Sequence, residues 1–118
     1  MSYMDGITGD DGLSSCVSDL NKWSHCLRSG KIINTTSLAQ MYTPHKLASG
    51  AGTNYGYGVM IRRGDGIENL TYHTGSWPGY TTLMLNLEES NQQVFILSNN
   101  YYDDQTFLAD EIITTLLR

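Results

Sequence analysis

The chain has 118 residues and a net charge of -5, with seven Lys and Arg against twelve Asp and Glu. No basic run offers a footprint for phosphate backbones, so we expect no nucleic-acid partner. No apolar stretch reaches the roughly 20 residues that a bilayer-spanning helix needs, so we expect a soluble chain without a membrane segment.

The first residues predict a segment outside the folded domain. Residues 1–11 mix Gly, Asp and Ser without periodicity, and we assign them to a flexible N-terminal segment. The remaining residues, 12–118, contain neither internal repeats nor low-complexity linkers. We therefore expect one domain over 12–118.

A long amphipathic helix is predicted between Leu13 and Gly30. Apolar residues recur there at helical spacing, Ser14 or Ser15 is the expected N-cap, and Gly30 is the expected stop. The apolar stripe of this helix predicts that Trp23 lies in the core.

A second, shorter helix is predicted from Thr35 to Tyr42. Asn34 is the expected N-cap, and Leu38 and Met41 share one face. Pro44 lies just beyond the last turn and ends the helix, because proline cannot continue it.

Strand-like segments separated by turn signals follow this helix. The turns are predicted at Arg63-Gly64-Asp65-Gly66, at Trp77-Pro78-Gly79 and at Glu88 to Asn91. Turns of this kind join antiparallel neighbours, so we expect an antiparallel meander of three to four strands. The expected strands are Tyr55 to Arg63, Thr71 to Gly75, Tyr80 to Leu87 and Gln93 to Ser98.

The C-terminal residues predict a last helix that covers the sheet. Asp103 or Asp104 is the expected cap. The order helix, helix, strands, helix predicts an α+β fold in which helices pack on the antiparallel sheet. Leu108, Ile112 and Leu116 form one apolar row of the helix, and Ala109, Ile113 and Leu117 form the adjacent row.

Five motifs in consistent order resemble the C-terminal half of serine β-lactamase-like and penicillin-binding-protein-like hydrolases. This family includes class C β-lactamases, D-aminopeptidases and related esterases, and the resemblance implies a partial β-lactamase/transpeptidase-like fold. The motifs are Gly12-Leu13-Ser14-Ser15 with Asp19-Leu20 and Trp23; Ser37-Leu38-Ala39-Gln40-Met41 with Thr43-Pro44-His45; Tyr55-Gly56-Tyr57-Gly58; His73-Thr74-Gly75-Ser76-Trp77-Pro78-Gly79-Tyr80; and Leu97-Ser98-Asn99-Asn100.

The nucleophile motif of this family is absent from the sequence. The family acylates the Ser of a Ser-x-x-Lys helix, and no Ser-x-x-Lys occurs in the 118 residues. Thr43-Pro44-His45-Lys46 has the spacing but the wrong first residue, and Pro44 opposes a helical presentation. For the family's Tyr-x-Asn or Ser-x-Asn element, only Ser98-Asn99-Asn100 matches, at a position where the family has a structural strand end.

The resemblance implies site residues on one strand. His73 takes the place of the first residue of the family's Lys/His-Thr/Ser-Gly element, beside the substrate's carbonyl or carboxylate. The N–H of Ser76 takes the place of one oxyanion-hole donor, and these two are the expected catalytic residues. Thr74 and Gly75 are expected to bind substrate, the former by hydrogen bonding and the latter by leaving the strand edge open.

Two aromatic residues complete the expected substrate-binding set, and a histidine departs from the commoner lysine. Trp77 and Tyr80 flank the turn and are expected to line the groove, although aromatic loop residues equally often cover a core edge. An imidazole, with a reference pKa near 6.5, makes substrate binding more dependent on pH than a lysine does. Tyr55 and Tyr57 are interpreted as packing residues.

The preferred interpretation is a fragment of an acyl-enzyme hydrolase for β-lactams, D-amino-acid peptides or esters, inactive alone. Its partner in the complete protein is a small acyl substrate, and neither a cofactor nor a metal is expected. The alternative is a non-catalytic interaction or regulatory module derived from the family. An upstream Ser-x-x-Lys helix in the gene favours the enzyme. The family is often exported, but no signal peptide is recognised here, so the location stays open.

The resemblance also implies that the last strand has lost a neighbour. In the family, this strand pairs with strands of the N-terminal segment, which leaves the edge beside Gln93 to Ser98 uncovered. An uncovered edge is a template for pairing with another chain, so we expect either fast hydrogen exchange at alternate amides of Val94 to Leu97 or self-association that covers the edge.

Overall fold

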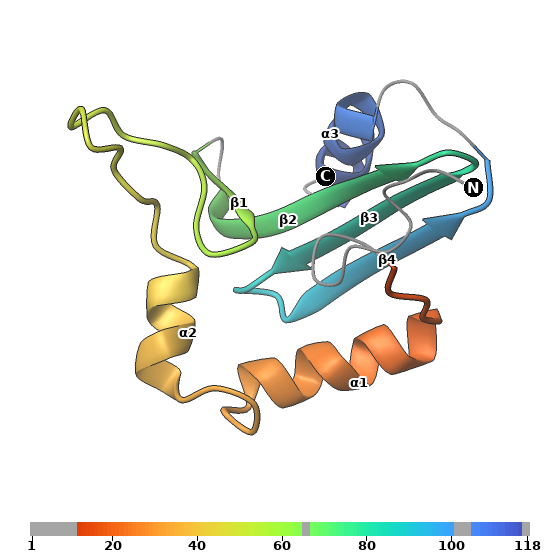
Figure 1. Ribbon diagram of the computed structural model, residues 1–118, viewed down its shortest axis with the longest axis horizontal. Helices are drawn as coiled ribbons and strands as arrows, with labels where there is room; N and C mark the ends of the chain where they lie inside the picture. Colours follow the sequence, from red (N-terminus) through yellow and green to blue (C-terminus); the bar gives the residue numbers. More distant parts are fainter. Residues whose placement is uncertain (1–11, 65–66, 101–104, 117–118) are drawn as a thin grey trace.

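A four-stranded antiparallel sheet with helices on both faces forms the protein, in a computed structural model that describes residues 12–64, 67–100 and 105–116 (Figure 1). The strand order β1-β2-β3-β4 follows the chain, which confirms the predicted α+β fold and antiparallel meander. The strands are β1 (Met60–Gly64), β2 (Ile67–Trp77), β3 (Tyr80–Leu87) and β4 (Gln92–Ser98), and the helices are α1 (Val17–Arg28), α2 (Thr35–Met41) and α3 (Gln105–Leu116).

The first helix, α1, begins later than the sequence predicts. Cys16 is the N-cap, and its carbonyl accepts the N–H groups of Asp19 at 3.1 Å and Leu20 at 3.0 Å. No side chain caps the helix, so the prediction of Ser14 or Ser15 as the cap is wrong. Both serines precede the true N-cap, and a capping hydroxyl must come from the N-cap residue itself to reach the first turn.

Gly30 ends α1 as predicted. Its φ of 75° lies in the left-handed region, where glycine has no Cβ penalty. The N–H of Lys31 donates to the carbonyl of Cys26 at 3.0 Å, and the N–H of Gly30 donates to that of Leu27 at 3.3 Å. This pair of bonds is a Schellman motif, which satisfies carbonyls that the helix end leaves open.

Trp23 does not lie in the core, contrary to the prediction. Its side chain is 41% exposed, whereas Ser24 and Leu27 are buried. The helix packs on the sheet through the row of Leu20, Ser24 and Leu27. The hydroxyl of Ser24 accepts a hydrogen bond from Gln93 of β4. Trp23 stands beside this row, because adjacent helical residues are about 100° apart around the axis.

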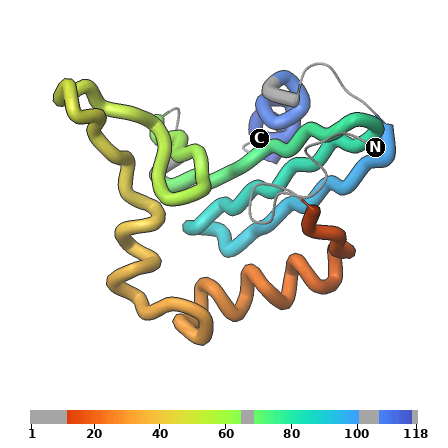
Figure 2. Tube along the Cα trace, viewed as in Figure 1, coloured from red at the N-terminus to blue at the C-terminus, as the bar shows by residue number. Residues whose placement is uncertain are grey.

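The second helix confirms its prediction closely. The Asn34 side chain accepts the N–H of Ser37 at 2.8 Å, as an N-cap does, and the helix ends at Met41 with Tyr42 as its C-cap. The chain then extends away from the sheet and returns to it before β1 (Figure 2).

The predicted strand from Tyr55 to Arg63 is only half present. β1 begins at Met60, and Tyr55 forms an isolated bridge back to Met60. The chain reverses at Gly58, whose φ is 72°, so the preceding residues fold against β1 instead of extending it. A Cβ on Gly56 would collide with the carbonyl oxygen of Met41, which fixes glycine in this turn.

Of the remaining strands, β3 has the predicted bounds, β4 begins one residue earlier, and β2 is longer at both ends. β2 extends over 11 residues, from Ile67 to Trp77, where the sequence predicted only 71–75. Pro78-Gly79 forms the predicted turn, with φ of 86° at Gly79, and brings Trp77 opposite Tyr80. Proline followed by a glycine of positive φ is the pattern of a type II turn.

The core lies between the sheet and α3. Leu70, Leu85 and Leu87 form a buried cluster with Ile113 of the helix, and Ala109 is also buried. The row Ala109 and Ile113 therefore faces the sheet, and Leu116 is partly exposed. The predicted helix cap at residues 103–104, the residue at 117 and the predicted N-terminal segment 1–11 lie outside the described residues.

The edge of β4 carries a testable prediction. The N–H of Glu88 donates to the carbonyl of Asn69, so even-numbered residues of β3 direct their backbone groups toward β2, and odd-numbered ones such as Leu83 bond their even-numbered partners on β4, such as Ile96. By the alternation of an antiparallel ladder, the amides of Phe95 and Leu97 point away from β3. In hydrogen-exchange NMR of a dilute sample we expect these two amides to exchange faster than those of Val94 and Ile96. Self-association through the edge would slow them as concentration rises, whereas uniformly slow exchange in a strict monomer would contradict an open edge.

Candidate functional site

The pairing of β1 with β2 stops just before the His-Thr-Gly motif. The last pair on that side is Met60 with Tyr72, and the partners of β1 all precede His73. On its other side β2 stays paired with β3 as far as Trp77. Among the described residues no strand covers the β1 side of 73–77, so one edge of the motif is open.

Alternation along β2 shows which backbone groups this edge presents. The carbonyl of Asn69 accepts the N–H of Glu88 at 3.2 Å, so odd-numbered residues of β2 direct their backbone groups toward β3. Even-numbered residues direct theirs to the opposite side. The backbone N–H and C=O groups of Thr74 and Ser76 therefore point to the open edge, with the spacing that an added extended chain would need.

The side chains of the motif divide between the two faces of the sheet. Leu70 and Tyr72 face α3, so Thr74 and Ser76 share that face by the two-residue period. His73 lies on the other face, together with Thr71, whose hydroxyl meets Asn86 at 3.4 Å. His73 and Thr74 are half-buried, and Ser76 is exposed.

Both ring nitrogens of His73 have partners. Nδ1 lies 2.6 Å from the carbonyl oxygen of Thr74, and Nε2 lies 2.8 Å from the hydroxyl of Tyr55. A carbonyl only accepts, so Nδ1 must carry the hydrogen. In the neutral ring Nε2 is then an acceptor, and the Tyr55 hydroxyl donates to it. The ring is thus oriented from both ends.

Tyr55 is the site residue that the sequence did not single out. It was interpreted as a packing residue, yet 41% of it is exposed and its hydroxyl bonds His73. The two rings are also edge to face, with centroids 6.0 Å apart. The reversal at Gly58 brings Tyr55 back to Met60, next to the end of the β1–β2 pairing. The only sequence signal was its place in the Tyr-Gly-Tyr-Gly motif.

Gly75 is constrained by its neighbour across the sheet. A Cβ at this position would collide with Oγ1 of Thr82, the residue paired with Gly75 on β3. The glycine thus makes room for a side chain on the sheet face, whereas the sequence interpretation assigned it to the open edge. That assignment stays a prediction.

Substituting Gly75 should therefore depend on Thr82. We expect Gly75→Ala to lower the free energy of unfolding by about 1–3 kcal/mol, the range for overpacked positions. Adding Thr82→Ala removes the obstructing hydroxyl and should recover most of that loss in a double-mutant cycle measured by urea unfolding. Additive effects of the two substitutions would show that the collision is not the cause.

The two aromatic site residues stand opposite each other at the end of the hairpin. Trp77 pairs with Tyr80, and both lie on the face of His73 by the sheet's period. Trp77 is half-buried, and Tyr80 is 57% exposed. The fold thus gathers His73, Gly75 and both aromatic residues on one face. The side chains of Thr74 and Ser76 lie on the opposite face, and their backbone groups point to the open edge.

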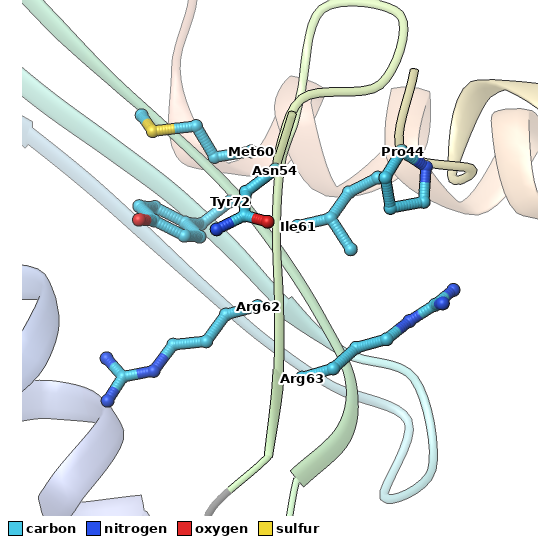
Figure 3. A pocket seen from close by; sticks show the side chains of 7 residues that line it. All are labelled: Pro44, Asn54, Met60, Ile61, Arg62, Arg63 and Tyr72. Carbon is cyan, nitrogen blue, oxygen red and sulfur yellow. The ribbon is translucent and has the colours of Figure 1, made fainter. Parts of the chain in front are cut away.

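Two cavities among the described residues lie outside the motif. A cavity of about 360 Å³ lies beside β1, where Arg62 extends toward α3 and pairs with Asp110, while Arg63 extends the opposite way (Figure 3). Tyr72, which immediately precedes the motif, is among its lining residues: Pro44, Asn54, Met60, Ile61, Arg62, Arg63 and Tyr72. The candidate site is an open strand edge and not an enclosed pocket.

A second, polar cavity of about 530 Å³ lies between α1, α2 and the β3–β4 turn. Arg28 and Glu88, both among its lining residues, form an ion pair at 3.5 Å. Burial raises the pKa of the Tyr42 phenol above its ordinary value; the carboxylate of Glu88 raises it further, and Arg28 lowers it. Tyr42 is therefore the neutral phenol at physiological pH, and the ion pair is the charged feature of this region.

Two features are absent from the described part of the chain, a cluster of metal ligands and a helix able to span a membrane. No three His, Cys, Asp or Glu side chains come together there as metal ligands. No helix in residues 12–64, 67–100 and 105–116 is long and apolar enough to cross a bilayer.

An antiparallel sheet covered by helices, with an open His-Thr-Gly edge on one strand, is the arrangement expected of a serine β-lactamase or penicillin-binding protein. The chain belongs to this class: the family model described as Beta-lactamase matches residues 2–116. It is 30% identical over 103 residues to penicillin-binding protein 4* of Bacillus subtilis, covering 87% of this chain and 23% of that protein.

A solved structure shares the fold. The crystal structure of a penicillin binding protein from Bacillus halodurans matches with a TM-score of 0.66 and 25% sequence identity. The match covers 84% of this chain and 29% of that chain. The chain therefore spans less than a third of the length of either relative, and its family and partial fold are confirmed.

Proposed function

We propose that this chain supplies one wall of the acyl-substrate site of a serine β-lactamase-like hydrolase. In this proposal the backbone of Thr74 and Ser76 binds an extended substrate along the open edge of β2. The N–H of Ser76 provides one donor for the developing oxyanion. Trp77 and Tyr80 border the substrate, and His73 stands beside it.

The open edge is the observation that carries the proposal. β1 leaves β2 at Tyr72 although β2 continues to Trp77, so five residues keep one side unpaired with any described strand. Such an edge in the middle of a sheet is a liability unless something binds to it. A substrate that adds as a short strand uses those backbone groups. The names of both relatives indicate penicillin binding, which fits an acyl ligand at this edge.

By itself the chain is proposed to bind such ligands without hydrolysing them. The serine that the family acylates belongs to a Ser-x-x-Lys helix, and the sequence contains none. One wall provides half of an oxyanion hole, so binding should be weak and non-covalent. The substrate class is a β-lactam, a D-amino-acid peptide or a small ester.

The alternative, a non-catalytic interaction module derived from the family, differs in what it binds. A module would use exposed apolar side chains, such as that of Trp23, in preference to the polar edge of β2. An acyl ligand that perturbs only residues 73–80 favours the hydrolase wall. A protein partner that protects Trp23 and leaves the edge open favours the module.

The experiment is an NMR titration of the chain with benzylpenicillin and with an acyl-D-alanyl-D-alanine peptide. We expect the largest amide shifts at Thr74 and Ser76, and we expect Ser76→Pro, which removes the edge N–H, to abolish them. Arg63→Ala at the neighbouring cavity is the matched control and should leave the titration unchanged. Shifts confined to the cavity of Figure 3, or none at millimolar ligand, would count against the proposed site.

A further inference from the structure

We propose that Tyr55 is the positioning residue of His73 and that its hydroxyl decides what His73 presents to a substrate. The inference rests on the proposed function above, because it concerns the same site. It starts from the two hydrogen bonds of the imidazole, at 2.8 Å to the hydroxyl of Tyr55 and 2.6 Å to the carbonyl of Thr74.

The contact with Thr74 fixes one nitrogen but leaves the ring mobile about that bond. A single hydrogen bond donated by Nδ1 favours one tautomer only while the ring stays in place, and it leaves the far nitrogen open to water. Water can donate to Nε2 or accept from it, and a ring with one partner has a broad χ2 distribution. A second partner on Nε2 removes that freedom.

Tyr55 provides the second partner from a part of the chain 18 residues earlier. Its phenol ring packs edge to face against the imidazole, so the hydroxyl has a defined approach. The hydroxyl donates to Nε2, since Nδ1 already carries the ring hydrogen. In the neutral ring both nitrogens are then occupied, so no N–H is free to donate to a substrate.

This arrangement changes the chemistry that the motif offers. A lysine at the place of His73 would present a charged donor directly. The His73–Tyr55 pair instead presents a phenolic oxygen whose own hydrogen is already donated to Nε2 of His73. Tyr55 as a whole is 41% exposed. The pair thus accepts hydrogen bonds from a substrate group, and it favours a neutral N–H or O–H donor over a carboxylate at that point.

The test compares the ring nitrogens of His73 in the intact chain and in Tyr55→Phe, by long-range ¹H–¹⁵N NMR. The chain itself should show a protonated Nδ1 and an unprotonated Nε2. In Tyr55→Phe the two ¹⁵N shifts should converge, because the ring then samples both tautomers. Tyr57→Phe is the matched control: it removes a hydroxyl two residues away, from a ring that contacts His45 and not His73.

A merely structural role of Tyr55 would move backbone amide shifts and leave the His73 tautomer unchanged. An unchanged tautomer in Tyr55→Phe, or a protonated Nε2 in the intact chain, would overturn the proposal. The affinity for the acyl-D-alanyl-D-alanine peptide should also fall about two- to tenfold in Tyr55→Phe, as expected for the loss of one hydrogen bond.

The two proposals fail separately. If the peptide shifts the amide resonances of Thr74 and Ser76 while the His73 tautomer does not depend on Tyr55, the positioning role is wrong and the proposed function stands. If Tyr55→Phe changes the tautomer but no ligand reaches the edge, the hydrogen bond is real and the proposed function is wrong.

Discussion

The isolated chain is expected to hydrolyse neither a chromogenic cephalosporin nor a nitrophenyl ester. Losing the acylated serine costs on the order of 10⁶ in rate in serine-hydrolase deletion series. No serine in the sequence is followed by lysine three residues later, so none has the activating neighbour that the family uses. The measurement is initial rate against enzyme concentration, with both substrates at saturating concentration.

The control for this expectation is His73→Ala, prepared in the same way. A trace of contaminating hydrolase would give the same rate in both preparations. Turnover that the intact chain shows and His73→Ala lacks would contradict the expectation, because it would mean that the chain carries its own nucleophile.

Leu85→Ala is expected to lower the free energy of unfolding by about 3 kcal/mol, within the range for buried leucines. Leu85 is 0% exposed at the centre of β3 and belongs to the cluster that includes Leu70, Leu87 and Ile113. Its loss leaves a cavity under α3 that neighbours on two strands cannot close. Urea unfolding followed by circular dichroism measures the change.

Leu97→Ala is the matched control on the edge strand. Leu97 is 41% exposed, so its truncation should cost less than about 1 kcal/mol. Equal losses at the two positions would contradict a core that lies between the sheet and α3.

The order of elements followed from local signals because each signal acts within a few residues. Asn34 caps α2, Gly30 ends α1, and Pro78-Gly79 turns β2 into β3, all as expected from their own chemistry. Motif order then indicated the family, since several weak motifs in sequence are more specific than any one alone.

The errors arose where distant segments decide the outcome. Trp23 fits the apolar stripe of α1, but the sheet meets the row of Ser24 and Leu27 instead. The pattern near Tyr55 resembles a strand, but the fit of Gly56 against Met41 and the reversal at Gly58 fold it back. Periodicity contains no information about which partner a face will meet.

The candidate site was likewise predictable from the sequence only in part. The motif from His73 to Ser76 could be found from the sequence, because its residues are contiguous and match a known pattern. The partner of His73 could not, because Tyr55 lies 18 residues away and reaches the ring only through the turn before β1. The open edge itself depends on where β1 stops pairing, which only the register reveals.

Hydrogen exchange at the edge of β2 tests the central claim most directly. Without ligand, the amides of Thr74 and Ser76 should exchange quickly, while those of His73 and Gly75, which face β3, should exchange slowly. Saturating acyl-D-alanyl-D-alanine peptide should slow Thr74 and Ser76 selectively, as backbone pairing with an added strand requires. Slow exchange of Ser76 in the free chain, or no selective slowing with the peptide, would contradict a substrate-binding edge at this position.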